Sequence, residues 1–448
     1  MKKLLVLLVY FISLLPLNAQ FFNLHQNEGL LSGGMGVTWI DGQPFYSVRF
    51  MPEIAFSNIG IGLDLNLEFN SAGKLRTENF NEFSDYTSVV RYVRYGHKND
   101  PVYARIGALD YATLGHGSIL YLYNNSPSYD SRKIGVAFDV DFNQFGFETI
   151  YGTFAQAGVA GIRGYIRPLK MTSAGSIPIL GNLEFGATFV GDFNENAGVR
   201  AGKIDLETQK FVSTIDEGTV TAFGFDVGLP IVRAKIVNLD IYFDYANITG
   251  FGSGTATGVI LRLNGLGLVD VATRLERRFN GDNYLPSYFN AMYEIERFNY
   301  DKTTGHVSSK IQTLKEIGKV GNGYYGELLI KLLNTFNIIG SYQRLDDFPK
   351  SGILHLSTDV SPEGTPFVAR AGYDKINIKN EKDLFTLDDR SYLFAELGYK
   401  PMPYIIVSMV YNWTFTPLRD GDDNIIKYVP QKKIEPRISF VYPFDFGG

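Results

Sequence analysis

The residues of this sequence that could perform hydrolytic chemistry lie together at His116-Gly117-Ser118, with Asp110 six residues before the histidine. A serine hydrolase needs a serine hydroxyl, a histidine base and an orienting acid in hydrogen-bond contact. His116 and Ser118 would share one face of a strand, because side chains alternate between its two faces. A shared face alone does not assemble a triad, so we expect no enzyme activity and no cofactor.

Metal binding is the second kind of chemistry to consider. None of the five histidines has a partner four residues away, so a helical zinc site is not predicted. Asp420, Asp422, Asp423 and Asn424 offer oxygen ligands that suit calcium, but they lack the spacing of the twelve-residue calcium loop. We interpret them as a solvated loop. The absence of cysteine excludes thiolate sites, and the net charge of −5 argues against a nucleic-acid partner.

The first residues have the pattern of a targeting segment. Two lysines precede an apolar run from Leu4 to Leu15, and Ala19 supplies the small residue expected at a cleavage position. The alternative is a retained membrane helix. It is disfavoured because Ser13 and Pro16 interrupt a run that is already shorter than the ~20 residues of a spanning helix. The pattern therefore predicts a signal peptide over residues 1–19 and an envelope location.

The elements that position these side chains are predicted to be strands. Apolar and polar residues alternate in four stretches, at 61–69, 134–142, 223–229 and 237–245, as expected for strands with two different faces. The longest of these runs have about nine or ten residues, enough to cross a bilayer at a tilt, whereas strands in globular proteins average about five or six. The pattern favours a single all-β transmembrane barrel over residues 20–448. A soluble secreted β-sandwich remains the alternative.

The polar faces of these stretches carry mainly glycine and acidic or amide residues, as expected for a wet interior. In a barrel the apolar face contacts lipid and the polar face lines the lumen. The residues expected to face the lumen are Asp64, Asn66, Glu68, Asp139, Asp141, Asp226, Asn238, Asp240 and Asp244.

Connections of two lengths are expected between the strands. Turn-forming residues predict short joins at 96–101, 143–144 and 264–265, whereas longer polar segments include 70–85 and 192–218. Barrels commonly have short turns on one rim and long loops on the other. If each strand with its connection takes roughly 25 to 28 residues, the mature chain should form about 16 strands, within a range of about 14 to 18.

One region breaks the strand pattern. Residues 286–298 begin with proline and serine, and Tyr288, Met292 and Ile295 recur at helical spacing, which predicts a short helix in an irregular insert over residues 286–320. The favoured interpretation is a helix that caps one rim of the barrel. The alternative is a plug in the lumen, whose polar residues would form a constriction: Asn290, Glu294 and Arg297.

The C-terminal segment and one hairpin carry a family resemblance. Aromatic and aliphatic residues at even spacing over 434–444 resemble the terminal signal that outer-membrane proteins present to the barrel-insertion machinery, although residues 445–448 extend past it. The leader, the four alternating stretches and the segment from 93–101 through 114–117 together resemble poorly characterised, porin-like outer-membrane β-barrels of Gram-negative bacteria.

This resemblance implies an outer-membrane location, contact with outer-membrane lipid and insertion by the barrel-insertion machinery. It also implies a porin-like channel or transporter for small polar solutes. The alternative from another class is a non-transporting barrel that acts in envelope assembly, surface attachment or secretion. A barrel hydrolase is the remaining candidate. Fold-level analogy does not choose between these functions.

Overall fold

The computed structural model describes residues 28–445 except 79, 81–85, 88, 155–157, 206, 266–268, 333–335 and 361–365. The predicted signal peptide, residues 1–19, lies outside the described residues. Among the helices that the structure does describe, none is both long and apolar enough to span a bilayer.

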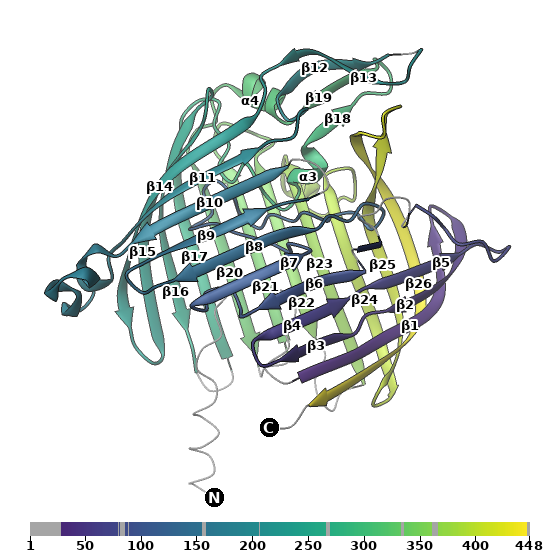
Figure 1. Ribbon diagram of the computed structural model, residues 1–448, viewed down its shortest axis with the longest axis horizontal. Coiled ribbons are helices and arrows are strands. Elements are labelled where there is room, and N and C mark those ends of the chain that lie inside the picture. The colour runs from purple at the N-terminus through teal and green to yellow at the C-terminus, as the bar shows by residue number, and fades with distance from the viewer. Residues whose placement is uncertain are drawn as a thin grey trace, which may run out of the picture.

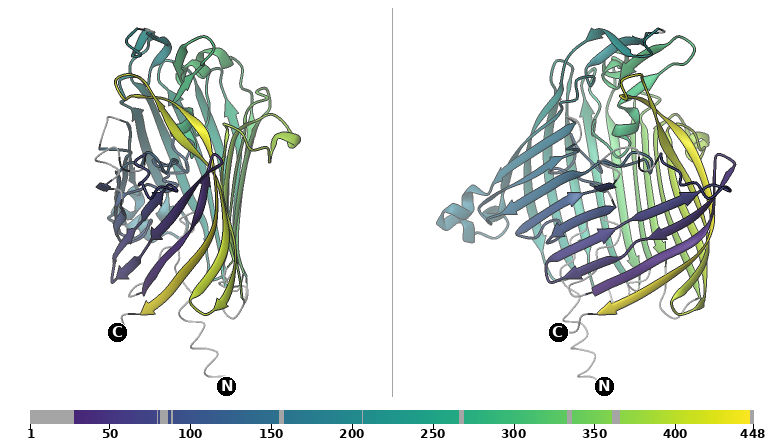
Figure 2. Two further views of the ribbon diagram at one scale, coloured as in Figure 1. Left: turned by 90° about the vertical axis from the view of Figure 1, so that its right-hand side faces the viewer. Right: turned by 45° about the vertical axis from the view of Figure 1, so that its right-hand side comes forward.

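The strands form one antiparallel sheet that closes on itself. The first strand, β1 (Glu28–Ile40), pairs on one side with β2 (Gln43–Phe50) and β3 (Glu53–Phe56), and on the other with the last strand, β26 (Ile425–Asp445). Closure leaves the wall without a free edge, so every strand can satisfy its backbone inside a membrane. Figures 1 and 2 show the resulting barrel, which is narrower in one direction than in the other.

The remaining wall strands pair with their neighbours in chain order. They are β4 (Ile59–Leu63), β5 (Leu65–Phe69), β6 (Val90–Tyr95), β7 (Val102–Gly107), β8 (Gly135–Asp141), β9 (Phe145–Tyr151), β10 (Val159–Ile166), β11 (Glu184–Asp192), β14 (Val220–Arg233), β15 (Val237–Ile248), β16 (Ser253–Leu263), β17 (Val269–Asn280), β20 (Gly323–Leu332), β21 (Phe336–Leu345), β22 (Gly352–Val360), β23 (Phe367–Ile378), β24 (Ser391–Met402) and β25 (Ile405–Arg419).

The barrel has 20 strands, so the expected number of about 16 is wrong. The sheet contains 22 paired segments, but β2 and β3 are one strand broken at residues 51–52, and β4 and β5 are one strand broken at Asp64. The prediction failed because it allotted too much chain to each connection. Two-residue turns at 41–42 and 57–58 join strands that the estimate would have spaced more widely.

The predicted alternation becomes two faces of the wall. In β15 the side chains of Ile241 and Phe243 are 41% and 45% exposed on the outside, whereas the intervening Tyr242 and Asp244 are buried inside. The same outward apolar pattern recurs in β4, β8 and β14. An apolar outer surface on a closed barrel is the arrangement of a membrane-spanning barrel, and it is the reverse of a soluble β-sandwich.

The two rims differ as the turn chemistry predicts. The start of β1 and the end of β26 lie at the same rim, which also carries the turns at 96–101, 142–144 and 264–265. The long connections at 70–89 and 193–219 lie at the opposite rim. Short turns identify the first rim as periplasmic. Its longest connection, residues 167–183, contains the 3-10 helices η2 (Pro168–Met171), η3 (Ser173–Ser176) and η4 (Leu180–Asn182).

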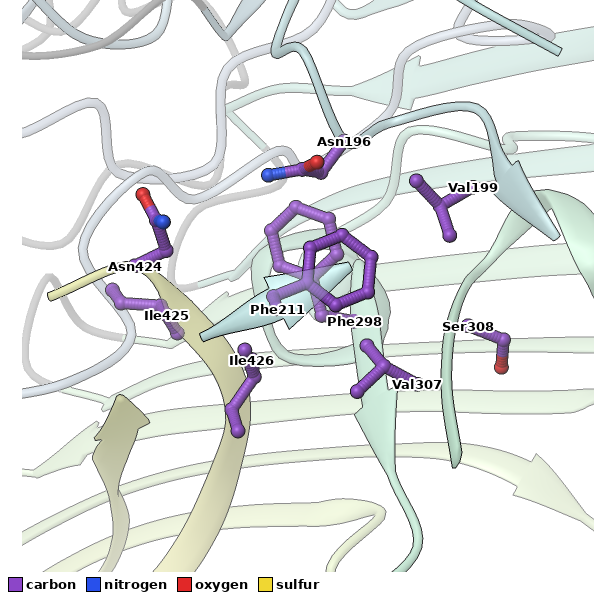
Figure 3. A pocket seen from close by; sticks show the side chains of 9 residues that line it. All are labelled: Asn196, Val199, Phe211, Phe298, Val307, Ser308, Asn424, Ile425 and Ile426. Atoms are coloured by element: carbon purple, nitrogen blue, oxygen red, sulfur yellow. The ribbon is translucent and has the colours of Figure 1, made fainter. Parts of the chain in front are cut away.

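A second, four-stranded sheet caps the long-loop rim. Its strands lie in the order β13 (Phe211–Asp216), β12 (Val199–Ile204), β19 (His306–Ser309) and β18 (Phe298–Tyr300). Figure 3 shows the pocket where Phe211 and Phe298 of this sheet meet Ile426 of β26. The backbone N–H of Phe211 donates to Asp420 in the β25–β26 turn at 3.0 Å, so this acidic loop fastens the cap to the barrel.

The predicted helix over residues 286–298 is reduced to one turn, α3 (Tyr293–Glu296), and a second short helix, α4 (Ile311–Ile317), follows in the insert. The reason is a backbone pairing that sequence periodicity does not report. The N–H groups of Ser287 and Phe289 donate to the carbonyls of Ser118 and Ile119 at 2.8 and 3.1 Å. The backbone of residues 287–289 is therefore paired with residues 118–120 and is not free to enter a helix.

Candidate functional site

Two long connections enter the lumen, and we call them together the plug. The inner loop, residues 108–134, connects β7 to β8, and the insert, residues 281–322, connects β17 to β20. They meet in a short parallel bridge between Leu120 and Phe289, both fully buried. Figure 1 shows α3 of the insert inside the barrel. The part of the insert around α3 therefore lies inside the barrel, where the alternative interpretation placed it, whereas β18 and β19 of the same insert belong to the sheet that caps the rim.

The apolar side of the plug packs on one region of the wall. Tyr288, Phe289 and Tyr293 of the insert form one buried cluster with small inward-facing residues of the strands β8 to β15. These wall residues include Ala137, Val159, Val190, Ala222 and Ala246. A hydrophobic stripe in a wet lumen would be costly, and small wall residues leave room to bury the aromatic rings.

The polar side of the plug centres on a buried carboxylate. Glu294 accepts hydrogen bonds from the Tyr123 hydroxyl and the Lys133 ammonium, each at 2.5 Å, and Arg297 lies 3.4 Å away. Burial alone would raise the pKa of Glu294, but the cations of Lys133 and Arg297 outweigh it and lower the pKa. Glu294 is therefore ionised at neutral pH and couples the inner loop to the insert.

Arg297 extends this cluster to the wall. Its guanidinium donates to Asp192 at the end of β11, and the Tyr293 hydroxyl donates to the same carboxylate at 2.7 Å. Asn290 uses its side-chain oxygen locally, accepting from the backbone N–H of Met292 at 2.9 Å. The residues expected to form a constriction, Asn290, Glu294 and Arg297, are thus buried in contacts that hold the plug.

A second ion cluster holds the other end of the inner loop. Arg76 donates two hydrogen bonds of 2.7 Å to Asp130, and Gln431 of β26 donates to the same carboxylate at 3.0 Å. Lys433 binds Glu68 at 3.2 Å and lies 3.9 Å from Asp130. Burial works against ionisation of Asp130, but its hydrogen bonds from Arg76 and the nearby Lys433 lower its pKa to about 2.

The hydrolytic candidate residues do come together, although not as a triad. Ser118 Oγ and His116 Nδ1 contact different oxygens of Asp244, at 2.5 and 2.9 Å, so one carboxylate separates the serine from the histidine. Asp110 lies elsewhere and binds Arg91 and Arg105 at 3.0 and 2.9 Å. These contacts hold the inner loop against β15. In the described geometry they do not place His116 to activate the hydroxyl of Ser118.

The nine acidic and amide residues expected in the lumen have varied contacts. Of these, Asp64, Glu68, Asp139, Asp226 and Asp244 are buried on the inner side, and Asn66, Asp141, Asn238 and Asp240 are half-buried. Cations bind most of the carboxylates: Arg49 to Asp64, Lys98 to Asp139, Arg167 to Asp141, Arg163 to Asp226, and Arg233 and Arg262 to Asp240. Asn66 donates to Glu68 at 3.1 Å.

Several important residues were not found from the sequence, most clearly the inward row Arg274, Glu276 and Arg278 of β17. Glu276 lies between the two arginines and forms ion pairs with both. The guanidinium of Arg274 also lies 5.1 Å from the ring centre of Tyr121, on the inner loop. Their spacing of two was a usable signal, because charged residues at alternate positions in a membrane strand must face the lumen.

The closed wall, its apolar outer face and its charged interior define an outer-membrane β-barrel of porin-like form. No family model matches the chain, and no curated protein matches it either. Solved structures align over nearly its whole length at low identity. Pseudomonas aeruginosa OccK5 (OpdH) aligns at 12% identity and a TM-score of 0.33, covering 93% of this chain and 98% of that one.

Two further solved structures give similar values. Acinetobacter baumannii OccAB3 aligns at 10% identity and a TM-score of 0.31, covering 93% of this chain and 98% of that one. A variant of the ferric enterobactin receptor of Pseudomonas aeruginosa, in complex with enterobactin, aligns at 8% identity and a TM-score of 0.37. That alignment covers 94% of this chain and 82% of the receptor. The architecture assigned to this chain rests on its own strand pairing.

Proposed function

We propose that this barrel is a channel or transporter for small polar solutes and that the plug is its gate. The observation that carries the proposal is the attachment of the plug. Both of its segments are tethered to wall strands at each end, and ion pairs such as Lys133–Glu294 and Arg76–Asp130 hold them across the lumen. Contacts of this kind can be exchanged for contacts with water or solute, unlike the hydrogen bonds of a continuous sheet.

The size and lining of the barrel support the same function. Barrels of about 16 to 18 strands enclose aqueous channels, and those of about 22 enclose a plug, so 20 strands leave room for both a plug and a path beside it. Many inward side chains of the wall are charged and paired, as in Arg163–Asp226 and Arg49–Asp64. Such a lining suits polar solutes and disfavours apolar ones.

Single-channel recording in planar bilayers tests the proposal. The intact protein should show low conductance most of the time, interrupted by brief increases when the plug moves. A variant in which a short glycine-serine linker replaces residues 286–298 should show a large, steady increase, because this segment carries α3 and the bridge to the inner loop. The matched control shortens the exposed β18–β19 turn at 301–305, in the same insert, and should conduct like the intact protein. An absence of conductance in all three proteins would contradict the proposal.

The second candidate is a non-transporting barrel that acts in envelope assembly, surface attachment or secretion. The observation that favours it is the apolar cluster around Phe289 and Leu120, which would hold the plug permanently in place. Under this function the linker variant would lose folding yield without gaining conductance. Heat-modifiable migration on gels reports folding of the barrel, so the two outcomes can be separated in one preparation.

A further inference from the structure

The connection at 167–183 is the exception among the periplasmic turns. It leaves the ends of β10 and β11, and Figure 1 and the right-hand view of Figure 2 show it projecting sideways from the wall. Many of its side chains are apolar and yet lie outside any core. Met171, Ile177, Ile179 and Leu180 are 42–49% exposed, and the only buried residue of its three helices is Gly181.

The charges of this projection are one-sided. Between Pro168 and Leu183 the single charged residue is Lys170, and there is no acidic residue. Arg167 lies at its base and pairs with Asp141 and Glu184 of the strand ends. An exposed apolar segment with a cation and no anion suits a surface that is apolar inside and carries anionic headgroups.

The backbone of the projection is largely satisfied within itself. The N–H groups of Lys170, Gly175 and Gly181 donate to the carbonyls of Arg167, Thr172 and Ile177 at 2.9–3.1 Å. The hydroxyls of Thr172 and Ser176 donate to carbonyls three residues earlier. A loop open to water has no need of such internal pairing, but a loop that meets lipid does, because lipid offers no hydrogen-bond partner.

The projection is also continuous with the lipid-facing wall. Ile166, the last residue of β10, and Phe185, near the start of β11, are exposed on the outer face and flank its two ends. A Cβ on Gly181 would lie 2.3 Å from the carbonyl oxygen of Gly175. The close approach of Gly181 to Gly175 keeps the projection compact. Its apolar residues extend the lipid-facing surface of the barrel outward.

We propose that residues 167–183 form a membrane-interface anchor whose apolar side chains enter the periplasmic leaflet of phospholipid beside the barrel. The occupant of this surface is lipid, with Met171, Ile177 and Leu180 among the acyl chains and Lys170 at the headgroups. The anchor would fix the depth and tilt of the barrel on the side of β10 and β11. The inference does not depend on whether the barrel conducts.

The absence of native cysteine allows a direct test with the full chain. A nitroxide is attached to Ile177→Cys in protein reconstituted into phosphatidylethanolamine–phosphatidylglycerol vesicles, and its collisions with oxygen and with a water-soluble nickel chelate are measured. Ile162→Cys, on the lipid face of β10, is the membrane control, and Thr208→Cys, in the exposed β12–β13 turn, is the aqueous control. The Ile177 label should lose nickel relaxation to the level of the Ile162 label and retain oxygen relaxation.

Two outcomes would overturn the anchor. Nickel accessibility equal to that at position 208 would mean that the segment lies in periplasmic water. Protection from both probes, with spectral broadening that disappears on dilution with unlabelled protein, would mean that a second copy covers the segment. As a second readout, Ile177→Asp with Leu180→Asp should lower the yield of folded barrel in vesicles. Ser173→Asp, an exposed polar position on the same segment, should leave that yield unchanged.

Discussion

Lys133 of the inner loop and Glu294 of the insert form an ion pair inside the barrel, with 2.5 Å between Nζ and Oε2, although 161 residues separate them in the chain. The pair links the two segments of the plug, and neither residue lies in a β-strand. Because Glu294 is almost completely buried, its charge has few alternatives to Lys133, Arg297 and the Tyr123 hydroxyl.

Lys133→Met should loosen the plug without damaging the wall. Removing one partner of a buried pair leaves the other charge uncompensated and typically costs about 3–5 kcal/mol. Backbone amides of residues 118–123 and 287–295 should therefore exchange hydrogen more than about 100-fold faster, which mass spectrometry measures. Lys302→Met, an exposed position of the same insert, is the control. Equal exchange in the two variants would show that the pair does not hold the plug.

Acid should release the inner loop in a defined pH window. Asp130 has its pKa lowered to about 2, so its contribution to docking is complete above its ordinary pKa of about 4 and is lost as the pH falls through about 2. Pepsin, which is active across this range, should cut residues 108–134 rapidly at the lower end only.

The exposed loop around Phe385 provides the reference for protease activity, since it should be cut at both ends of the range. In Asp130→Asn the hydrogen bonds from Arg76 and the attraction of Lys433 weaken, so cleavage of the inner loop should no longer depend on pH. Rapid cleavage of the unmodified loop at pH values above about 4 would contradict the role of Asp130.

Features that depend on residues close together in the sequence could be predicted, and features that depend on residues far apart in the sequence could not. Alternation around Ile241 and Asp244 reports the two faces of a strand, because each residue's facing is a local property. The predicted strand number was wrong because connection lengths vary widely around the barrel, and many are shorter than the estimate assumed. The helix predicted at 286–298 is shortened to one turn because the backbone of Ser287 and Phe289 pairs with a segment about 170 residues away.

The candidate site was only partly accessible to sequence reasoning for the same reason. Glu294 and Arg297 could be selected as polar residues of an insert, but their partners Lys133 and Asp192 belong to other connections and carry no local signal. His116 and Ser118 do contact one carboxylate, but they lie in a loop and not on the face of a strand as predicted, and the acid they share, Asp244, lies more than 120 residues away. Local spacing therefore identified individual members of each cluster but not the cluster.

The signal peptide can be tested independently of the fold. Protein extracted from the envelope should have the intact mass of a chain that begins at Gln20, because the small residue Ala19 precedes the expected cut. Ala19→Leu should slow processing and accumulate a heavier species. A mature mass that includes residues 1–19 would rule out the predicted cleavage.

The small residues of the wall beneath the plug make a final prediction about packing. Ala222 of β14 is 1% exposed and belongs to the cluster that includes Phe289 and Tyr293. Ala222→Leu would insert a larger side chain into this filled space, and overpacking of this kind costs about 1–3 kcal/mol. The plug should yield before the wall does, because the hydrogen-bond ladder between β11 and β14 is unchanged. Hydrogen exchange should accelerate in residues 287–295 while that of β14 stays slow.

Ala187→Leu is the matched control, since Ala187 is exposed on the neighbouring strand β11 and faces lipid. If both variants exchange like the unmodified protein, the plug does not pack on this part of the wall.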